Sequence, residues 1–406
     1  MSDFPNDSMS DSIHPDRAAD DLRADWAALR EERPGIRTRN AAAELGVSEA
    51  ELVATGCRRP DASDTSVKSD AGGPDGTTAR PTPGATSRRI EADVERILPG
   101  LVALGPLMAL TRNDLFVHEK TGVYGEVYVN PHVSSVVGEE IDLRIFPARW
   151  KHGFAVETEG RGSRRRSFQF FDAEGVAVHK IFLTEESDVE AYEALVDELL
   201  HPDQSPALEV DDEDESEIGH PEADGDDGAE RDEGATHQEK VATTREVDVA
   251  ALEADWRAMK DTHDFHGLLR EHGVARTRAL RLVSDELARP ASNDGVRRIL
   301  ETASRERIEI MVFVQSPGTI QIHHGPVSRI VDTPPWLNVL DGDFDLHVLE
   351  EGIAATWVVR KPVETGWVTS VEVYDAADTL CALFFGYRKE GQPEDPAWRE
   401  LAEALE

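Results

Sequence analysis

The sequence contains the same series of segments twice, and this duplication constrains the fold more than any other feature. The segment DLRADWAAL at 21–29 recurs as ALEADWRAM at 251–259, and IDLRIF at 141–146 recurs as FDLHVL at 344–349. In the first pair, apolar residues stand at positions i, i+4 and i+7, which form one face of a helix. A chain with the same order of segments in both halves is expected to build one supersecondary unit twice.

The spacing between matching segments shows where the two copies differ. It is longer for the tryptophan-containing pair than for IDLRIF and FDLHVL, and the difference is close to the length of the segment 57–88. That segment is rich in Pro, Gly, Ser and Thr and contains almost no large apolar side chain. It cannot bury enough surface to offset the entropy of ordering. We therefore predict that 57–88 is a disordered insertion in the first copy.

A second low-complexity stretch, residues 202–246, separates the two copies. Within it, residues 206–240 contain 15 Asp or Glu against only Arg231 and Lys240. A run of like charges repels itself and is typical of a linker. The predicted organisation is a disordered tail, an N-terminal repeat, an acidic linker and a C-terminal repeat, at 1–20, 21–201, 202–246 and 247–406.

Each copy has helical patterns before and after a group of short apolar or alternating runs. TRNAAAELGVSEAELVATG at 38–56 is helical in pattern, with Ser48 and Glu51 spaced as a capping box. Runs such as AVHKIFL at 177–183 and IMVFVQ at 310–315 are typical of strands, and the Gly, Pro, Asp and Asn between runs favour antiparallel connections. The sequence predicts an α+β protein with internal duplication: two similar units, each with a large antiparallel sheet flanked by helices.

The formal net charge is −38, and only eight of the 43 basic residues are lysine. General nucleic-acid binding is not expected, since it requires a basic surface. An acidic surface with few lysines is typical of proteins that work in multimolar salt, where charge repulsion is screened. We hypothesise a salt-loving source; a GC-rich genome is the alternative explanation for the arginine bias.

The chain shows no pattern for export or for membrane insertion. It has no run of 18 apolar residues, and its N-terminus is acidic and polar rather than basic and then apolar. Cys57 and Cys381 are its only cysteines and form no CxxC pair, so neither a disulfide framework nor a zinc site is predicted. The predicted location is the cytoplasm.

Common nucleotide-binding, zinc-protease and serine-hydrolase motifs are absent from the sequence. The neighbours His323 and His324 lie in a predicted strand and point to opposite faces, so the two rings cannot bind one metal ion. We expect both to be surface histidines.

Long blocks in both halves resemble the HemS/ChuS-type haem-trafficking and haem-degrading family. Those of the second half include WRAMKDTHDFHGLL, IMVFVQSPGTIQIHHG, PWLNVLD and FDLHVLEEGIAATWVVRKP, and those of the first half include LMALTRNDLFVHEKTGVYGEV and GEEIDLRIFPARW. The similarity covers nearly the whole chain except the tail and the two linkers. It implies a duplicated α+β protein of bacterial haem uptake that binds one haem in a cleft between its halves; several members degrade haem with a reductant and oxygen.

The resemblance assigns the axial iron ligand to His263, in the segment MKDTHDFHG. A neutral imidazole with one free nitrogen suits this role. The alternative is a half-buried histidine that caps the helix after Asp261. His266, one helical turn later, is an alternative ligand or an ordinary surface histidine.

On the opposite haem face, the resemblance places Arg144, from the segment DLRIF, and makes it the candidate catalytic residue. A guanidinium stays protonated, so it can orient a bound water or oxygen species without binding iron. The alternative is a strand arginine that pairs with a carboxylate. The counterpart of Arg144 in the second copy is His347, so the halves differ at this position.

The resemblance also implies residues that contact the rest of the haem. Arg276, Lys361 and Arg388 match the cations that bind the two propionates. Phe313 and Phe385 match positions beside the macrocycle.

This sequence departs from the family at two of the lining positions. The family often has Tyr at the position of Phe385 and a polar residue at the position of Leu383. Both are apolar here, so any hydrogen bond from them to haem or its water is lost.

His118, in FVHEKTG, matches a first-half histidine that holds a second haem in some members. The alternatives are a strand histidine that pairs with Glu119 and one exposed to solvent.

The resemblance therefore predicts a cytoplasmic haem-binding protein, with a haem importer and an electron donor as further partners. In one hypothesis it opens the haem ring oxidatively. In another it is a non-catalytic chaperone or storage protein that passes haem to a separate oxygenase. A third is a duplicated binding module for a different planar anion.

Overall fold

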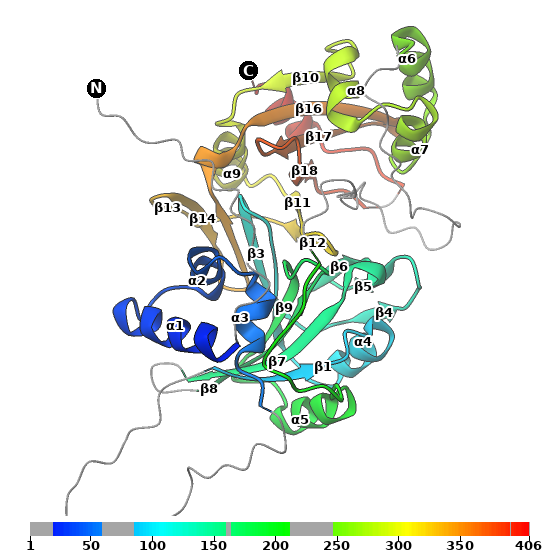
Figure 1. Cartoon of the computed structure of the whole chain (residues 1–406). Helices are drawn as coiled ribbons and strands as arrows, with labels where there is room; N and C mark the ends of the chain where they lie inside the picture. Colours follow the sequence, from blue (N-terminus) through cyan, green and yellow to red (C-terminus); the bar gives the residue numbers. More distant parts are fainter. Residues whose placement is uncertain (1–18, 59–84, 160–163, 212–246, 390, 406) are drawn as a thin grey trace, which may run out of the picture.

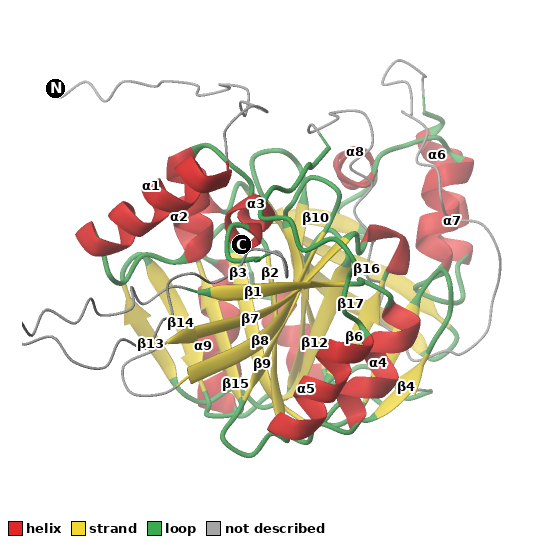
Figure 2. Ribbon diagram, turned by 60° about the horizontal axis from the view of Figure 1, so that its bottom comes forward, coloured by secondary structure: helices red, strands yellow, loops and turns green. Residues whose placement is uncertain are grey.

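The computed structural model describes residues 19–58, 85–159, 164–211, 247–389 and 391–405. Within these ranges the chain forms two nine-stranded sheets in which every pair of neighbours is antiparallel (Figure 1). Helices lie around the outside of the sheets (Figure 2). The predicted α+β class with large antiparallel sheets flanked by helices is confirmed.

The order of strands across each sheet is similar in the two halves. The first sheet runs β1 (Thr86–Ile90), β7 (His152–Glu159), β8 (Arg164–Phe171), β9 (Ala177–Leu183), β2 (Leu107–Arg112), β3 (Phe116–Gly122), β15 (Phe344–Val348), β14 (Trp336–Leu340) and β13 (Ile330–Thr333). The second runs β10 (Ala288–Ala291), β16 (Ala355–Val363), β17 (Gly366–Tyr374), β18 (Leu380–Gly386), β11 (Ile310–Gln315), β12 (Thr319–Gly325), β6 (Asp142–Ile145), β5 (Ser134–Val137) and β4 (Glu126–Tyr128).

The two repeats exchange strands. β13, β14 and β15 come from the second repeat but complete the first sheet, while β4, β5 and β6 come from the first repeat and complete the second sheet. The two junctions have the same register: His347 of β15 lies opposite Val117, and Arg144 of β6 lies opposite Ile320. The repeat in the sequence thus relates one junction to the other, residue for residue. A 3₁₀ turn follows each of these strands, at Pro147–Arg149 and Glu350–Gly352.

The helices also repeat. α1 (Ala19–Glu32), α2 (Thr38–Leu45) and α3 (Glu49–Ala54) correspond to α6 (Val249–Ala258), α7 (Asp264–Glu271) and α8 (Arg276–Leu282). α4 (Val94–Val102) and α5 (Val189–Glu198) correspond to α9 (Gly295–Glu306) and α10 (Pro396–Glu403). The helical pattern at 38–56 is thus two helices, separated at Gly46 in the left-handed conformation, and the predicted capping box of Ser48 and Glu51 begins the second.

Helices pack on both faces of each sheet. Helix α3 packs on one face of the first sheet against Phe154 and Phe171, and α1 and α2 pack on α3. Helices α4 and α5 cover the other face through Phe168 and Phe170. The core around α4 and α5 also contains Leu143 of the second sheet. The core around α9 and α10 likewise contains Phe116 of the first sheet. The two repeats therefore share their interior.

The predicted linker boundaries need correction where the structure describes them. Thr86–Ile90 forms β1, which overlaps the end of the predicted insertion at 57–88, because its backbone pairs with β7 along its length. Residues 202–211 belong to the predicted linker but contact β1: the Arg89 guanidinium is 2.8 Å from Asp203, and the Arg89 amide donates to the Gln204 side chain. Helix α1 begins at Ala19, inside the predicted tail. Cys57, at the start of the predicted insertion, is buried in an apolar cluster with Phe154 and Phe171. Residues 1–18, 59–84 and 212–246 lie outside the described residues.

Candidate functional site

Helices α6, α7 and α8 form a cap over one face of the second sheet. Phe265 of α7 packs edge-on against Trp256 of α6, with ring centroids 4.4 Å apart. The Trp256 indole donates a hydrogen bond to the Arg360 carbonyl of β16, which fixes α6 on the sheet. These rings belong to an apolar cluster that includes Phe313 and Phe385.

His263 stands at the N-terminus of α7, with 47% of its side chain exposed. Its Nδ1 lies 2.7 Å from the Asp261 carboxylate. His263 is the N-cap residue of α7, as the helix-capping alternative predicts, but its side chain is exposed and makes no capping bond. A carboxylate accepts hydrogen bonds, so Nδ1 is the donor, and in the neutral ring the lone pair is on Nε2. This is the arrangement that an iron-binding histidine requires.

The Asp261 carboxylate connects His263 to a predicted propionate ligand. Partial burial opposes its ionisation, but hydrogen bonds from the His263 amide and ring, together with the positive charge of Arg388, outweigh this, so the pKa of Asp261 is below its ordinary value. The charge of Arg388 therefore acts on the N-terminal end of α7, where His263 lies. His266 lies one turn farther along and is half-buried.

Arg144 faces the same side of the second sheet. It lies opposite Ile320, and its neighbour on this face of the strand, Phe146, packs against the cluster under α6–α8. The Arg144 guanidinium also bonds to Asp142 on its own strand. That pairing is the predicted carboxylate alternative, and it leaves the guanidinium partly exposed.

Arg276 and Lys361 come together below α7, around a carboxylate that the sequence reasoning missed. Glu372 of β17 is fully buried and accepts two hydrogen bonds from Arg276, at 2.9 and 2.7 Å, while the Lys361 ammonium is 3.8 Å away. Tyr374 donates a third bond at 2.6 Å. Burial raises the pKa of Glu372, but the charges of Arg276 and Lys361 lower it more, and the net shift is downward.

Both cations also lie over the Phe265 ring of α7. The Arg276 guanidinium carbon is 5.0 Å from the ring centroid, and the Lys361 ammonium is 4.3 Å from it. The side chains are only 4% and 1% exposed, respectively. The signal that could have revealed Glu372 is its place within the apolar strand β17, since a buried carboxylate needs cationic partners.

Phe313 of β11 and Phe385 of β18 contact each other, with ring centroids 5.2 Å apart and planes at 67°. Leu383 is fully buried beside them in the same cluster. The structure thus gathers Phe313, Phe385, the Arg276–Lys361 pair, Arg144 and His263 on one face of the second sheet.

His118 does not belong to this group. It lies in β3 with its ring fully buried, 5.0 Å from the Phe344 ring, and neither ring nitrogen has a hydrogen-bond partner among the described residues. Both predicted alternatives, a pair with Glu119 and exposure to solvent, are therefore wrong. Burial, followed by the charges of His323 and Lys120, lowers the pKa of His118 well below its ordinary value.

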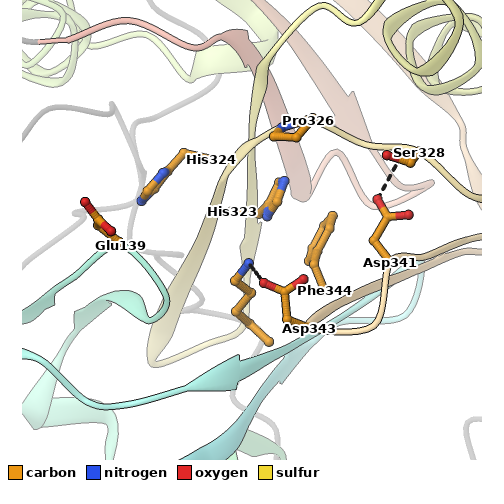
Figure 3. A pocket seen from close by; sticks show the side chains of 9 residues that line it. Glu139, His323, His324, Pro326, Ser328, Asp341, Asp343 and Phe344 are labelled. Carbon is orange, nitrogen blue, oxygen red and sulfur yellow. Dashed lines mark hydrogen bonds and ion pairs between the residues drawn. The ribbon is translucent and has the colours of Figure 1, made fainter.

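The expectation of two surface histidines is wrong for His323. Its ring is 4% exposed and stacks on Phe344, with centroids 3.7 Å apart and planes 4° apart (Figure 3). His323 pairs with Val312 of β11 and faces Phe344 of the other sheet, while His324 is partly exposed. Beside the Phe344 ring, Lys120 and Asp343 form an ion pair of 2.9 Å at a hollow of about 430 Å³.

A second hollow, of about 300 Å³, lies on the first sheet. Its walls are Arg37, Val117, Thr333, Trp336, Asn338, Leu340 and His347. Sequence reasoning noted His347 only as the counterpart of Arg144. The strand exchange brings it beside Arg37, although the two residues belong to opposite halves of the chain.

Among residues 19–405, leaving aside the four undescribed gaps, no helix has the length and apolar character that crossing a bilayer requires. In the same ranges, no three His, Cys, Asp or Glu side chains gather closely enough to hold a bare metal ion.

The haemin-degrading HemS.ChuX domain model matches residues 76–199 and 273–405. The hemin transport proteins HmuS of Yersinia pestis and HemS of Yersinia enterocolitica are 33% and 32% identical to this chain. The matches cover 93% and 92% of this chain and 95% and 94% of the relatives.

Two solved structures share the whole architecture. Holo-PhuS, a heme-binding protein from Pseudomonas aeruginosa, is 40% identical, with a TM-score of 0.79 over 96% of this chain and 99% of its own. ChuS, described as an E. coli heme oxygenase, is 30% identical, with a TM-score of 0.73 over 95% of this chain and 99% of its own. With its internal duplication and its similarity to these relatives along nearly its whole length, the chain belongs to the HemS/ChuX family of haemin-degrading domains.

Proposed function

We propose that this protein is a cytoplasmic haem-binding protein, which takes up haem after import and either degrades it oxidatively or delivers it. Its relatives support this proposal, because they are described as hemin transport, heme-binding and heme oxygenase proteins. A haem importer and an electron donor would be its partners.

The single observation that carries the proposal is the state of His263. Its ring is exposed at the start of a helix. Its Nδ1 donates a hydrogen bond to Asp261, so Nε2 is the nitrogen that would bind iron. His266, one turn along, would be the alternative ligand.

The surrounding residues fit a porphyrin. Phe313 and Phe385 would supply aromatic surface for the macrocycle, and Arg388, whose charge acts on Asp261 beside His263, would bind a propionate. Arg276 and Lys361 are more deeply buried, so a propionate reaches them only if α7 moves away from the sheet. Until then Glu372 holds both cations in place.

Bound haem would supply a redox-active iron and the ring carbon that is oxidised. Arg144 would line the haem pocket on the side away from His263 and donate hydrogen bonds from its guanidinium to a small oxygen-containing molecule there. Its contact with Asp142 would fix the guanidinium and keep it from moving into solvent. The apolar Leu383 and Phe385 would exclude water from the same side.

Degradation and delivery are separated by a single-turnover experiment. The haem complex is mixed with ascorbate and oxygen in the presence of catalase, and the Soret band and the tetrapyrrole product are followed. Loss of the band with formation of an open tetrapyrrole supports degradation. Persistence of the band without product supports a chaperone or storage role.

Arg144→Ala and Arg144→Lys test the catalytic residue in this experiment. We expect haem affinity to change little in both variants and turnover to slow at least tenfold in Arg144→Ala, since removal of one preorganised donor has effects of that order or larger. Undiminished turnover in Arg144→Ala would show that Arg144 has no role in turnover.

A further inference from the structure

The hollow of about 430 Å³ lies where the two sheets meet, apart from the candidate haem site. Lys120 and Phe344 line it from the first sheet, and His323 and His324 from the second. Ile322, the neighbour of His323, packs into the cluster under α6–α8, so His323 points to the opposite face of β12. A ligand in this hollow would therefore contact both sheets and lie outside the haem site.

The His323 ring restricts what the hollow can bind. It is 4% exposed and lies flat against Phe344 (Figure 3), yet neither ring nitrogen has a hydrogen-bond partner among the described residues. The Pro326 carbonyl is near the ring but makes no bond of ordinary geometry with it. Burial, followed by the charge of Lys120, lowers the pKa of His323 to about 3, so the ring is neutral near pH 7. A neutral imidazole has one donor and one acceptor, and it is unfavourable to leave both unpaired in the interior.

The charged groups around the hollow also require a ligand that both donates and accepts. The Lys120 ammonium has three N–H donors, of which Asp343 accepts one at 2.9 Å, and the Lys120 side chain is only 8% exposed. Asp341 already accepts two backbone amide hydrogen bonds, at 2.8 and 2.7 Å. Glu139 and Asp343 are exposed at the rim and supply further acceptors (Figure 3). Donors thus lie at the buried end of the hollow and acceptors at its rim.

This lining disfavours ions as ligands. Among the described residues, no three His, Cys, Asp or Glu side chains gather closely enough to hold a metal ion, and the Lys120 ammonium repels cations at the buried end. The three carboxylates, against that one ammonium, repel anions. An organic ammonium donates hydrogen bonds but cannot accept them, so it would leave the donors of Lys120 and His323 unpaired. A hydroxyl group is uncharged, donates one hydrogen bond and accepts two.

We propose that this hollow binds a small compound with several hydroxyl groups, a monosaccharide or another polyol. Its hydroxyls would pair with both ring nitrogens of His323, accept from Lys120 and donate to Glu139, while Phe344 holds the His323 ring in place. The volume lies within the range of about 300–1,000 Å³ that is usual for small-molecule sites. It is also far larger than the volume of about 30 Å³ that one water molecule takes up in the liquid.

The test is saturation-transfer difference NMR on the full-length protein, titrated separately with D-glucose, myo-inositol and sorbitol. Sugars also stabilise proteins by exclusion from their surface, so the signal is read from the ligand protons and not from protein stability. We expect a saturable signal from at least one of the three. Binding of glucose or inositol without sorbitol identifies a cyclic ligand, and the reverse identifies an open chain.

Two variants of the hollow locate the signal. His323→Phe keeps the stacked ring but removes both nitrogens, and Lys120→Met removes the ammonium; each should weaken binding at least about fivefold, since hydrogen bonds to the ligand are lost. The matched controls, His132→Gln and Lys151→Met, change exposed residues and should bind like wild type. Near-ultraviolet circular dichroism shows whether each variant is folded, and the two variants of the hollow test the site independently.

Three outcomes overturn the proposal. Without a saturable signal from any of the three compounds, the hollow holds only water. A signal that is equal in wild type, His323→Phe and Lys120→Met comes from another part of the surface. Saturable binding of methylammonium or acetate, with none of a polyol, shows that the class of ligand is wrong. Haem titrations should be unchanged by the bound polyol, so this test does not depend on the proposed function.

Discussion

At the scale of residues, two side chains determine what the candidate site does, and the first is His263. His263→Ala should shift the ferric Soret band and raise the Kd for haem by at least tenfold, because an axial iron bond is lost. Optical titration measures both. Asp261→Asn should have a smaller effect, since it weakens the hydrogen bond that orients the ring.

His266→Ala is the matched control, one turn away on the same helix. Alone it should leave the spectrum unchanged. If the His263→Ala, His266→Ala double variant keeps the wild-type spectrum, neither histidine is the iron ligand.

The second side chain is Glu372. Glu372→Gln leaves Arg276 and Lys361 buried without their shared counter-charge, so it should lower the free energy of unfolding by about 3–5 kcal/mol. Urea denaturation at pH 7 measures this loss. Tyr374→Phe, which removes one hydrogen bond and keeps the charge, should cost only about 1–2 kcal/mol.

The difference in the free energy of unfolding between wild type and Glu372→Gln should also depend on pH. The pKa of Glu372 is lowered in the folded state, so its ion pairs contribute fully above the ordinary glutamate pKa of about 4.3 and are lost as the pH falls through the lowered value. The gap between wild type and Glu372→Gln should therefore be constant near neutrality and narrow below about pH 4. A gap that stays the same down to pH 3 would contradict this assignment.

Sequence reasoning reached the residues of the site unevenly. His263 and Arg144 came from the resemblance, because no property of a lone histidine or strand arginine distinguishes it from a surface residue. Glu372 escaped notice because its cationic partners lie on another strand and on a helix, at contacts of 2.7–3.8 Å that no local pattern encodes. His323 was misplaced for the same reason: it is buried against Phe344, which lies on a strand of the other sheet.

At the scale of elements, strand β12 places His323 in the interior without a hydrogen-bond partner among the described residues. Burial, followed by the charge of Lys120, lowers the pKa of His323 to about 3. The unfolded state takes up a proton near the ordinary pKa of about 6.5, so this residue makes the protein lose stability as pH falls from there towards 3.

We expect His323→Phe to reduce that loss by up to about 1.4 kcal/mol per pH unit, since a phenyl ring can stack on Phe344 and does not titrate. Unfolding midpoints at pH 7 and pH 5 measure the effect. His132→Gln, at an exposed loop position, should behave like wild type. An equal decline with pH in His323→Phe and wild type would show that His323 is not buried neutral.

The elements that the sequence predicted best are those with a local signature. The runs at 177–183 and 310–315 are strands β9 and β11 with the predicted bounds, because apolar residues dominate both. The edge strands β1, β10 and β4 were missed, since Thr86–Ile90 and Ala288–Ala291 contain Arg or Pro in place of such a run. Strand exchange was missed too, because pairing between opposite halves of the chain leaves no trace in a local pattern.

At the scale of the whole molecule, the shared cores and exchanged strands predict that the halves do not fold separately. Residues 1–211 and 247–406, produced as two chains, should each lack a cooperative unfolding transition, because each sheet would lose three of its nine strands. Mixing them should restore a one-to-one complex with native circular dichroism, detected by size-exclusion chromatography. Cooperative unfolding of either half alone would contradict this.

The net charge of −38 gives a second prediction at this scale. If the acidic surface is an adaptation to salt, the free energy of unfolding should rise steeply between 0.1 and 3 M KCl, because screening shortens the range of repulsion from about 10 Å to less than about 3 Å. Chemical denaturation with urea, which is uncharged, measures it. If the protein is fully stable in dilute buffer, the acidic surface is not an adaptation to salt. A GC-rich genome then explains the arginine bias.

The exchange of β4–β6 for β13–β15 is what two identical subunits do when they swap equivalent arms about a two-fold axis. A chain with one repeat and this fold would need a second copy to complete its sheet, and its stability would fall on dilution. Joining the two copies makes that encounter intramolecular and independent of protein concentration. It also lets the two positions at the swap diverge, so that one became Arg144 and the other His347, which no symmetric pair of subunits could achieve.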